Sequence, residues 1–144
     1  VLSEKLVHLQ NRIQENMQCA HHFYMMPQAS FHQTVVNTLS GSRFKEHIAD
    51  KGLEAKYTEI IQNAFDKTAQ FPLQAPIKMT FTGIAIFGSA IGVLGILEKE
   101  QDWKSIMQLR EDLYTNSDLN AHDIKRTRPF IAHITLGNID GELT

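Results

Sequence analysis

The stretch "FHQTVVNTL" at residues 31–39 places a histidine, a spacer, a threonine and then apolar residues in what we predict to be one short β-strand. The same order returns as "HITL" at residues 133–136, inside a second predicted strand, "PFIAHITLGNI", at residues 129–139. Residues two positions apart in a strand project from the same face, at a spacing of about 6.5–7 Å. We therefore expect His32 to project with Thr34, and His133 with Thr135.

These four side chains suit a phosphodiester if the two strands lie near each other in one sheet. One neutral imidazole can take a proton from an attacking water or hydroxyl, and the other, as imidazolium, can give one to the leaving oxygen. The threonine hydroxyls can donate to the non-bridging phosphate oxygens and hold the group in line. This chemistry requires no metal and no cofactor. In the alternative interpretation, each histidine is a half-buried residue bonded to a backbone carbonyl, and each threonine is there for its β-propensity.

The rest of the chain alternates between helical and extended patterns. Apolar residues at steps of three and four predict helices at residues 3–18, with Ser3 as N-cap, at 53–65 and at 103–113. Residues 19–30 have no period and contain Pro27, so they are predicted to form a loop.

The run from Met79 to Leu97 carries no charge and is long enough to span a bilayer as a helix. Its glycines, its threonines and the turn-like "FGSA" at residues 87–90 instead favour a hairpin of two buried strands within residues 76–98. The hairpin is our prediction, with a membrane helix as the alternative.

Composition narrows the class of protein. A chain of 144 residues, 42% hydrophobic and 21% charged, predicts a single globular domain over residues 1–144. A formal net charge of −2 argues against a broad basic surface that would coat a nucleic-acid duplex. Cys19 is the only cysteine, which suits a reducing compartment and predicts a cytoplasmic protein. Cys19, His21 and His22 lack a carboxylate or second cysteine to complete a metal site, so we expect no bound metal.

The two motifs lie about one hundred residues apart, the first reached through "MMPQASFHQTVV" and the second set in "FIAHITLG". In this the chain resembles, over most of its length, the two-histidine (2H) phosphoesterase superfamily, the LigT-like or 2',5'-RNA-ligase-like group. The resemblance implies an α+β, bilobal fold, with antiparallel sheets related by pseudo-twofold symmetry around a central cleft, helices outside, and one motif from each lobe. A single cleft shared by both motifs rules out a membrane span between them.

The resemblance also implies a function and a set of site residues. It implies metal-independent hydrolysis of 2',3'-cyclic phosphates or 2',5'-linked phosphodiesters of nucleotides or RNA ends, as in RNA processing. By motif match, His32 and His133 would be the catalytic pair, and Thr34 and Thr135 the phosphate-binding hydroxyls. Related proteins usually have a strand before the first helix and further strands after the second motif, and we expect this chain to lack them.

Four further residues are weaker candidates for substrate contacts. Tyr24 stands in the predicted loop before the first motif, where it would stack on a base or cap the core. A basic cluster just before the second predicted strand consists of Lys125, Arg126 and Arg128. These residues would attract an anionic substrate or form a solvated loop. The alternative function is a module that binds a nucleotide or RNA end without turnover. A third function is a fold retained for protein contacts. The sequence leaves open the physiological substrate, which histidine is the acid, and the oligomeric state.

Overall fold

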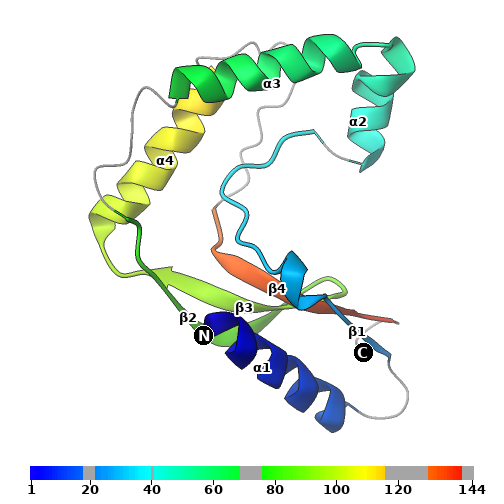
Figure 1. Ribbon diagram of the computed structural model, residues 1–144, viewed down its shortest axis with the longest axis vertical. Helices are drawn as coiled ribbons and strands as arrows, with labels where there is room; N and C mark the ends of the chain where they lie inside the picture. Colours follow the sequence, from blue (N-terminus) through cyan, green and yellow to red (C-terminus); the bar gives the residue numbers. More distant parts are fainter. Residues whose placement is uncertain (18–21, 40, 69–75, 116–129, 141–144) are drawn as a thin grey trace. The chain divides into compact units, whose positions relative to one another are not determined.

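A computed structural model of the protein describes residues 1–17, 22–39, 41–68, 76–115 and 130–140 (Figure 1). The chain divides into two compact units, which we call the sheet unit and the helical unit. The sheet unit comprises Val1–Thr34, Met79–Ile96 and Ile131–Thr144, and the helical unit comprises Val35–Lys78 and Leu97–Phe130. Both His-x-Thr motifs therefore belong to the sheet unit.

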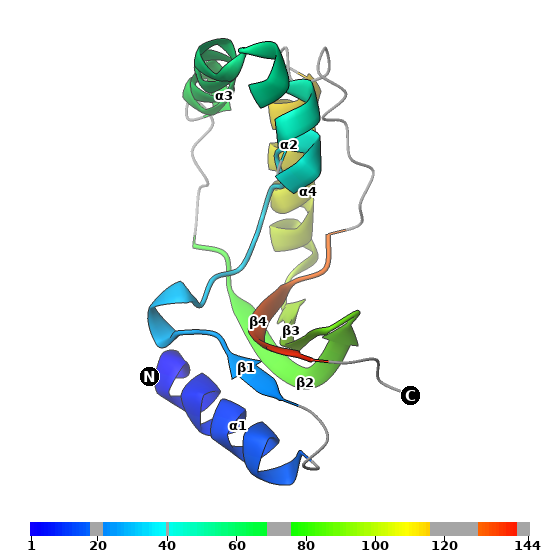
Figure 2. The same ribbon diagram turned by 90° about the vertical axis from the view of Figure 1, so that its right-hand side faces the viewer.

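The sheet unit contains helix α1 (Leu2–Asn16) and four strands: β1 (Phe23–Met25), β2 (Met79–Phe87), β3 (Ala90–Leu97) and β4 (His133–Ile139). The strand order is β1-β4-β3-β2, and β4 runs antiparallel to both β1 and β3. Helix α1 lies against one face of this sheet (Figures 1 and 2). The buried residues between them are Leu6, Phe23, Ile91, Val93, Ile134, Leu136 and Ile139.

Helix α1 confirms the first predicted helix, although its N-cap is Val1 rather than Ser3. A short strand, β1, and the 3-10 helix η1 (Gln28–Ser30) lie within the segment that we predicted to be a loop. The β1 strand has only three residues, too few for a period-two pattern to be recognised in the sequence.

Residues 79–97 form the predicted hairpin, with a turn at Gly88 and Ser89 between β2 and β3. Gly88 has a φ of 61°, a conformation that glycine adopts without steric cost. Among the helices that the structure describes, none is long and apolar enough to cross a membrane.

A β-bulge in β4 follows the second motif directly. Ile91 pairs with Gly137 but Gly92 pairs with Thr135, so β4 has one extra residue, Leu136, opposite this point of β3. The carbonyl of Leu136 accepts hydrogen bonds from Met26 N (2.8 Å) and from Nε2 of Gln10 (2.6 Å). Gln10 also donates to Met26 O (2.8 Å) and is only 3% exposed. A buried helix side chain thus holds the bulge, and with it the strand that bears the second motif.

The prediction of a strand at residues 31–39 is wrong, because these residues have no regular secondary structure. The reason is that side chains, rather than a neighbouring strand, bind the backbone at every second residue from Val35 to Leu39. In the helical unit Arg110 Nη1 donates to Val35 O (2.6 Å), Tyr114 Oη donates to Asn37 O (2.7 Å), and Leu39 N donates to Tyr57 Oη (3.0 Å). Backbone groups satisfied in this way need no β-ladder.

The helical unit contains α2 (Gly41–His47), the 3-10 helix η2 (Ala49–Lys51), α3 (Glu54–Thr68) and α4 (Glu100–Thr115). Helices α3 and α4 confirm the second and third predicted helices, whereas α2 was not predicted. The buried core of this unit is formed by Leu39, Ile48, Tyr57, Ile60, Ala64, Leu113 and Tyr114.

The α+β class is confirmed by four helices and one antiparallel sheet in the described part of the chain. The predicted pseudo-twofold symmetry is not confirmed. No strand occurs among the described residues of the helical unit, and the two motifs share one unit instead of being divided between two lobes.

Candidate functional site

The second motif lies at the start of β4. His133 and Thr135 are half-buried, whereas Ile134 and Leu136 are buried in the core that α1 covers. Because side chains alternate across a strand, His133 and Thr135 project from the sheet face opposite α1.

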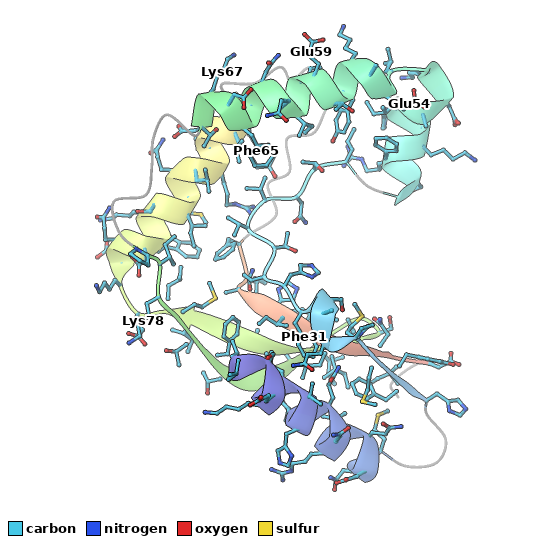
Figure 3. The ribbon with its side chains drawn as sticks, viewed as in Figure 1. Phe31, Glu54, Glu59, Phe65, Lys67 and Lys78 are labelled. Carbon is cyan, nitrogen blue, oxygen red and sulfur yellow. The ribbon has the colours of Figure 1, made fainter. Side chains whose placement is uncertain are left out.

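The first motif follows η1 and leaves its histidine and threonine side chains in solvent. His32 and Thr34 are exposed, while Phe31 and Gln33 between them are half-buried. Phe31 packs against the core of the sheet unit and is labelled in Figure 3. The alternation expected of a strand is therefore present in this segment, although the strand itself is not.

One side chain joins the two motifs. The amide nitrogen of His133 donates a hydrogen bond to Oε1 of Gln33, the residue between His32 and Thr34. Nε2 of Gln33 in turn donates to the carbonyl of Thr34 (2.7 Å). Gln33 therefore brings the first motif directly beside the backbone of the second.

The sheet explains why this amide nitrogen is available. Gly95 N donates to Ala132 O, so the next residue along β4, His133, directs its backbone N–H away from β3. On that other side, β1 pairs with β4 only from Ile139 to Gly137. Gln33 supplies the partner that a longer strand β1 would have supplied.

The two histidines make the same hydrogen bond. Nδ1 of His32 bonds to the carbonyl of Ser30 (2.8 Å), and Nδ1 of His133 bonds to the carbonyl of Ile131 (2.7 Å). In both cases the acceptor is the residue two positions earlier. A carbonyl oxygen only accepts, so each Nδ1 carries a hydrogen and each neutral ring keeps its lone pair on Nε2. In this tautomer, Nε2 is the ring nitrogen that can accept a proton in each histidine.

An aromatic side chain packs beside the second histidine. The ring centroids of Phe87 and His133 are 4.9 Å apart, with the ring planes tilted by 39°. Phe87, at the end of β2, lies over Gly92 of β3, where an added Cβ would stand 3.6 Å from the Phe87 ring and 3.0 Å from Ile134 O. The distance to the Phe87 ring is an ordinary van der Waals distance, whereas the distance to Ile134 O is tight, so it is the backbone of β4 that leaves little space for a side chain at this position.

Tyr24 lies on the same sheet face as the second motif. It pairs with Asn138, and the preceding pair, Phe23 and Ile139, is buried on the side of α1. Tyr24 is 58% exposed, and its ring centroid is 6.4 Å from that of His22. It is thus available for a ligand contact and does not cap the core. Lys125, Arg126 and Arg128 lie outside the described residues.

Three residues that support the site were missed by sequence reasoning: Gln10, Gln33 and Phe87. Gln10 could have been identified from the sequence, because it occupies the apolar stripe of its helix, four residues after Leu6 and three before Ile13. A polar residue on a buried helix face indicates a specific hydrogen-bond partner. Gln33 and Phe87 had no comparable signal, since their roles depend on contacts with residues distant in the sequence.

In the described ranges, no group of three or more histidine, cysteine, aspartate or glutamate side chains is arranged to hold a metal ion. Cys19 and His21 lie outside those ranges.

Comparison with known proteins finds a match to a protein-family model. A family model named 2H-phosphodiest, described as a domain of unknown function (DUF1868), matches residues 1–90. These residues run from α1 through the first motif to the start of β3, and the second motif lies beyond them. No curated protein and no solved structure matches the chain. The match covers more than half of the sequence, and the chain therefore belongs to the 2H phosphoesterase family.

Proposed function

We propose that the protein is a metal-independent phosphodiesterase that acts on 2',3'-cyclic phosphates or 2',5'-linked phosphodiesters of nucleotides or RNA ends. His32 and His133 would be its general acid and base. The observation that carries the proposal is the matched pair of Nδ1 hydrogen bonds, which leave the same ring nitrogen of both histidines free for proton transfer. Membership of a family whose name is 2H-phosphodiest supports the phosphoesterase class.

In the proposed reaction, the neutral histidine accepts a proton at Nε2 from the attacking water. The water oxygen forms a bond to phosphorus as the bond from phosphorus to the leaving oxygen breaks. The other histidine, as imidazolium, gives its Nε2 proton to that leaving oxygen. Water is added across the bond and a phosphomonoester is formed, with the two histidines left in exchanged protonation states.

Each histidine would be held ready for this step by its own backbone carbonyl. The Nδ1–H group donates to the carbonyl in both protonation states, so the hydrogen bond persists while Nε2 gains or loses its proton. A ring fixed in this way need not reorient between the two halves of a turnover, which is the advantage of preorganisation.

Thr34 and Thr135 would donate their hydroxyl hydrogens to the non-bridging phosphate oxygens. Thr34 is exposed beside His32, and Thr135 shares the sheet face of His133. Tyr24, on that same face, would contact the part of the substrate beyond the phosphate, by stacking on a base. Lys125, Arg126 and Arg128 would add positive charge near the anionic substrate.

The test is product analysis by phosphorus NMR, with a chelator present, on a panel of 2',3'-cyclic and 2',5'-linked nucleotides. The variants are His32→Ala and His133→Ala, and the matched control is His8→Ala. His8 is exposed on α1, the helix that covers the other face of the sheet. We expect wild type and His8→Ala to turn over the same substrate, and both site variants to lose activity by at least about 100-fold, the scale of general acid–base catalysis.

Near-full activity of either site variant would overturn the two-histidine mechanism. Binding of a cyclic nucleotide by wild type without any product would instead favour the alternative, a module that binds a nucleotide or RNA end without turnover. The position of phosphate in the product identifies which bond was broken.

A further inference from the structure

We propose that Gln33 is a positioning residue that sets the place of His32 and Thr34 relative to His133. The inference rests on the proposed function and adds to it a residue that does not touch the reacting atoms. The hydrogen bond from His133 N to Gln33 Oε1 links the two motifs through one side chain.

Gln33 uses both ends of its amide. Oε1 accepts from the backbone of the second motif, and Nε2 donates to the carbonyl of Thr34 in the first motif (2.7 Å). The side chain is half-buried, so it is partly shielded from competition by water. An amide bonded at both ends fixes two backbone segments against each other.

The segment needs such a link because it is not a strand. His32 and Thr34 are exposed and lie outside the sheet, whereas His133 and Thr135 are held by the β-ladder with β3. A regular sheet would fix the two motifs in register through its backbone hydrogen bonds. Gln33 does this through a side chain instead, and the distance between the two imidazoles then depends on its length and hydrogen bonds.

Two substitutions separate positioning from simple stabilisation. Gln33→Met keeps the length of the side chain and removes both hydrogen bonds. Gln33→Glu keeps an acceptor for His133 N, loses the donor to Thr34 O, and places a negative charge beside the site. The matched control is Gln28→Met, an exposed glutamine of η1 on the same segment.

We expect Gln33→Met to lower kcat by about 10- to 100-fold, because misplacement of a catalytic group by about 1 Å costs a factor of that order. Its KM should change little. Gln33→Glu should recover most of kcat but raise KM, since its carboxylate repels the phosphodiester while its oxygen still fixes His133. Gln28→Met should match wild type in both constants. A residue with a merely structural role would lower the melting temperature without this division between kcat and KM.

A second measurement keeps the inference independent of turnover. In NMR spectra we expect Gln33→Met to speed the hydrogen exchange of the His133 amide and to shift the imidazole resonances of both His32 and His133. If wild type turns over a substrate and Gln33→Met keeps its kcat, the inference is overturned and the proposed function stands.

If wild type turns over nothing, the proposed function fails, and the spectra decide the positioning role. Shifts at both imidazoles then support positioning by Gln33. Unchanged His32 and His133 resonances overturn it.

Discussion

Replacement of Gln10 by methionine tests whether the buried amide on α1 holds the β4 bulge that follows the second motif. Methionine has a similar length and no hydrogen-bonding amide. Gln10→Met removes two hydrogen bonds, from Nε2 to Met26 O at 2.8 Å and to Leu136 O at 2.6 Å. The carbonyl of Leu136 keeps its bond from Met26 N, whereas the carbonyl of Met26 loses its side-chain donor.

The expected loss of stability follows from the number of hydrogen bonds removed. A hydrogen bond contributes about 1 kcal/mol net, and a buried acceptor left without a partner costs about 1–3 kcal/mol. Burial of the apolar methionine offsets part of the loss. We expect the free energy of unfolding to fall by about 2 kcal/mol, which corresponds to a fall in melting temperature of about 6–8 °C for a chain of this size.

The assay is urea-induced unfolding followed by far-ultraviolet circular dichroism, with Trp103 fluorescence as a second probe. Trp103 is the only tryptophan and belongs to the helical unit, so its signal separates that unit from the one that is altered. Gln14→Met is the matched control, since Gln14 is exposed four residues further along the same helix. A free energy of unfolding for Gln10→Met within about 0.5 kcal/mol of wild type, the range of neutral surface substitutions, would show that the Gln10 amide does not hold the bulge.

Three further predictions concern the strand, the segment after the first motif and the phosphate site. Gly137→Ala should lower the free energy of unfolding, measured in urea, by about 1–3 kcal/mol, because a Cβ there would meet the Phe23 ring and stand 2.5 Å from Tyr24 O. A loss of stability no larger than that of Asn138→Ala would contradict this prediction. Tyr114→Phe should lower the free energy of unfolding by about 1 kcal/mol in the same assay, because its hydrogen bond to Asn37 O is lost. An unchanged urea midpoint would argue against this contribution. Thr135→Val should reduce kcat/KM by about 10- to 100-fold while Thr135→Ser stays close to wild type, and equal losses in both would exclude a hydroxyl contact with phosphate.

Regular elements with a repeating pattern were predictable from the sequence. The apolar stripe from Leu6 to Ile13 predicted α1, because burial of one helix face requires residues at steps of three and four. "FGSA" divided the uncharged run of residues 79–97 into two strands, since Gly88 takes a turn conformation with a φ of 61°. In both cases the residues that determine the element lie within it.

The segment after the first motif was not predictable in the same way. Residues 31–39 are rich in valine and threonine and have a strand pattern, but side chains of α3 and α4 bind their backbone in place of a neighbouring strand. Helix α2 was missed for a related reason, because its seven residues, Gly41–His47, contain only one large apolar side chain. Tertiary contacts decided both outcomes against the local pattern.

Only the reactive groups of the candidate site could be predicted from the sequence. Histidine and threonine in a repeated pattern identify a chemistry, so His32 and His133 were found without a structure. The contacts that position these groups join residues far apart in the chain. Gln33 meets a backbone amide one hundred residues away, and Phe87 reaches His133 from another strand. No local pattern encodes such contacts.

In the proposed site, both histidines hold Nδ1–H on a backbone carbonyl and present Nε2 to the substrate. Nitrogen-15 NMR of protein labelled at histidine reads the tautomer of each neutral ring directly, with exposed His8 as the internal reference. We predict a protonated Nδ1 and an unprotonated Nε2 for both His32 and His133, in contrast to the Nε2–H form that free histidine prefers. An Nε2–H tautomer at either residue would exclude the matched Nδ1–H hydrogen bonds on which the proposed mechanism depends.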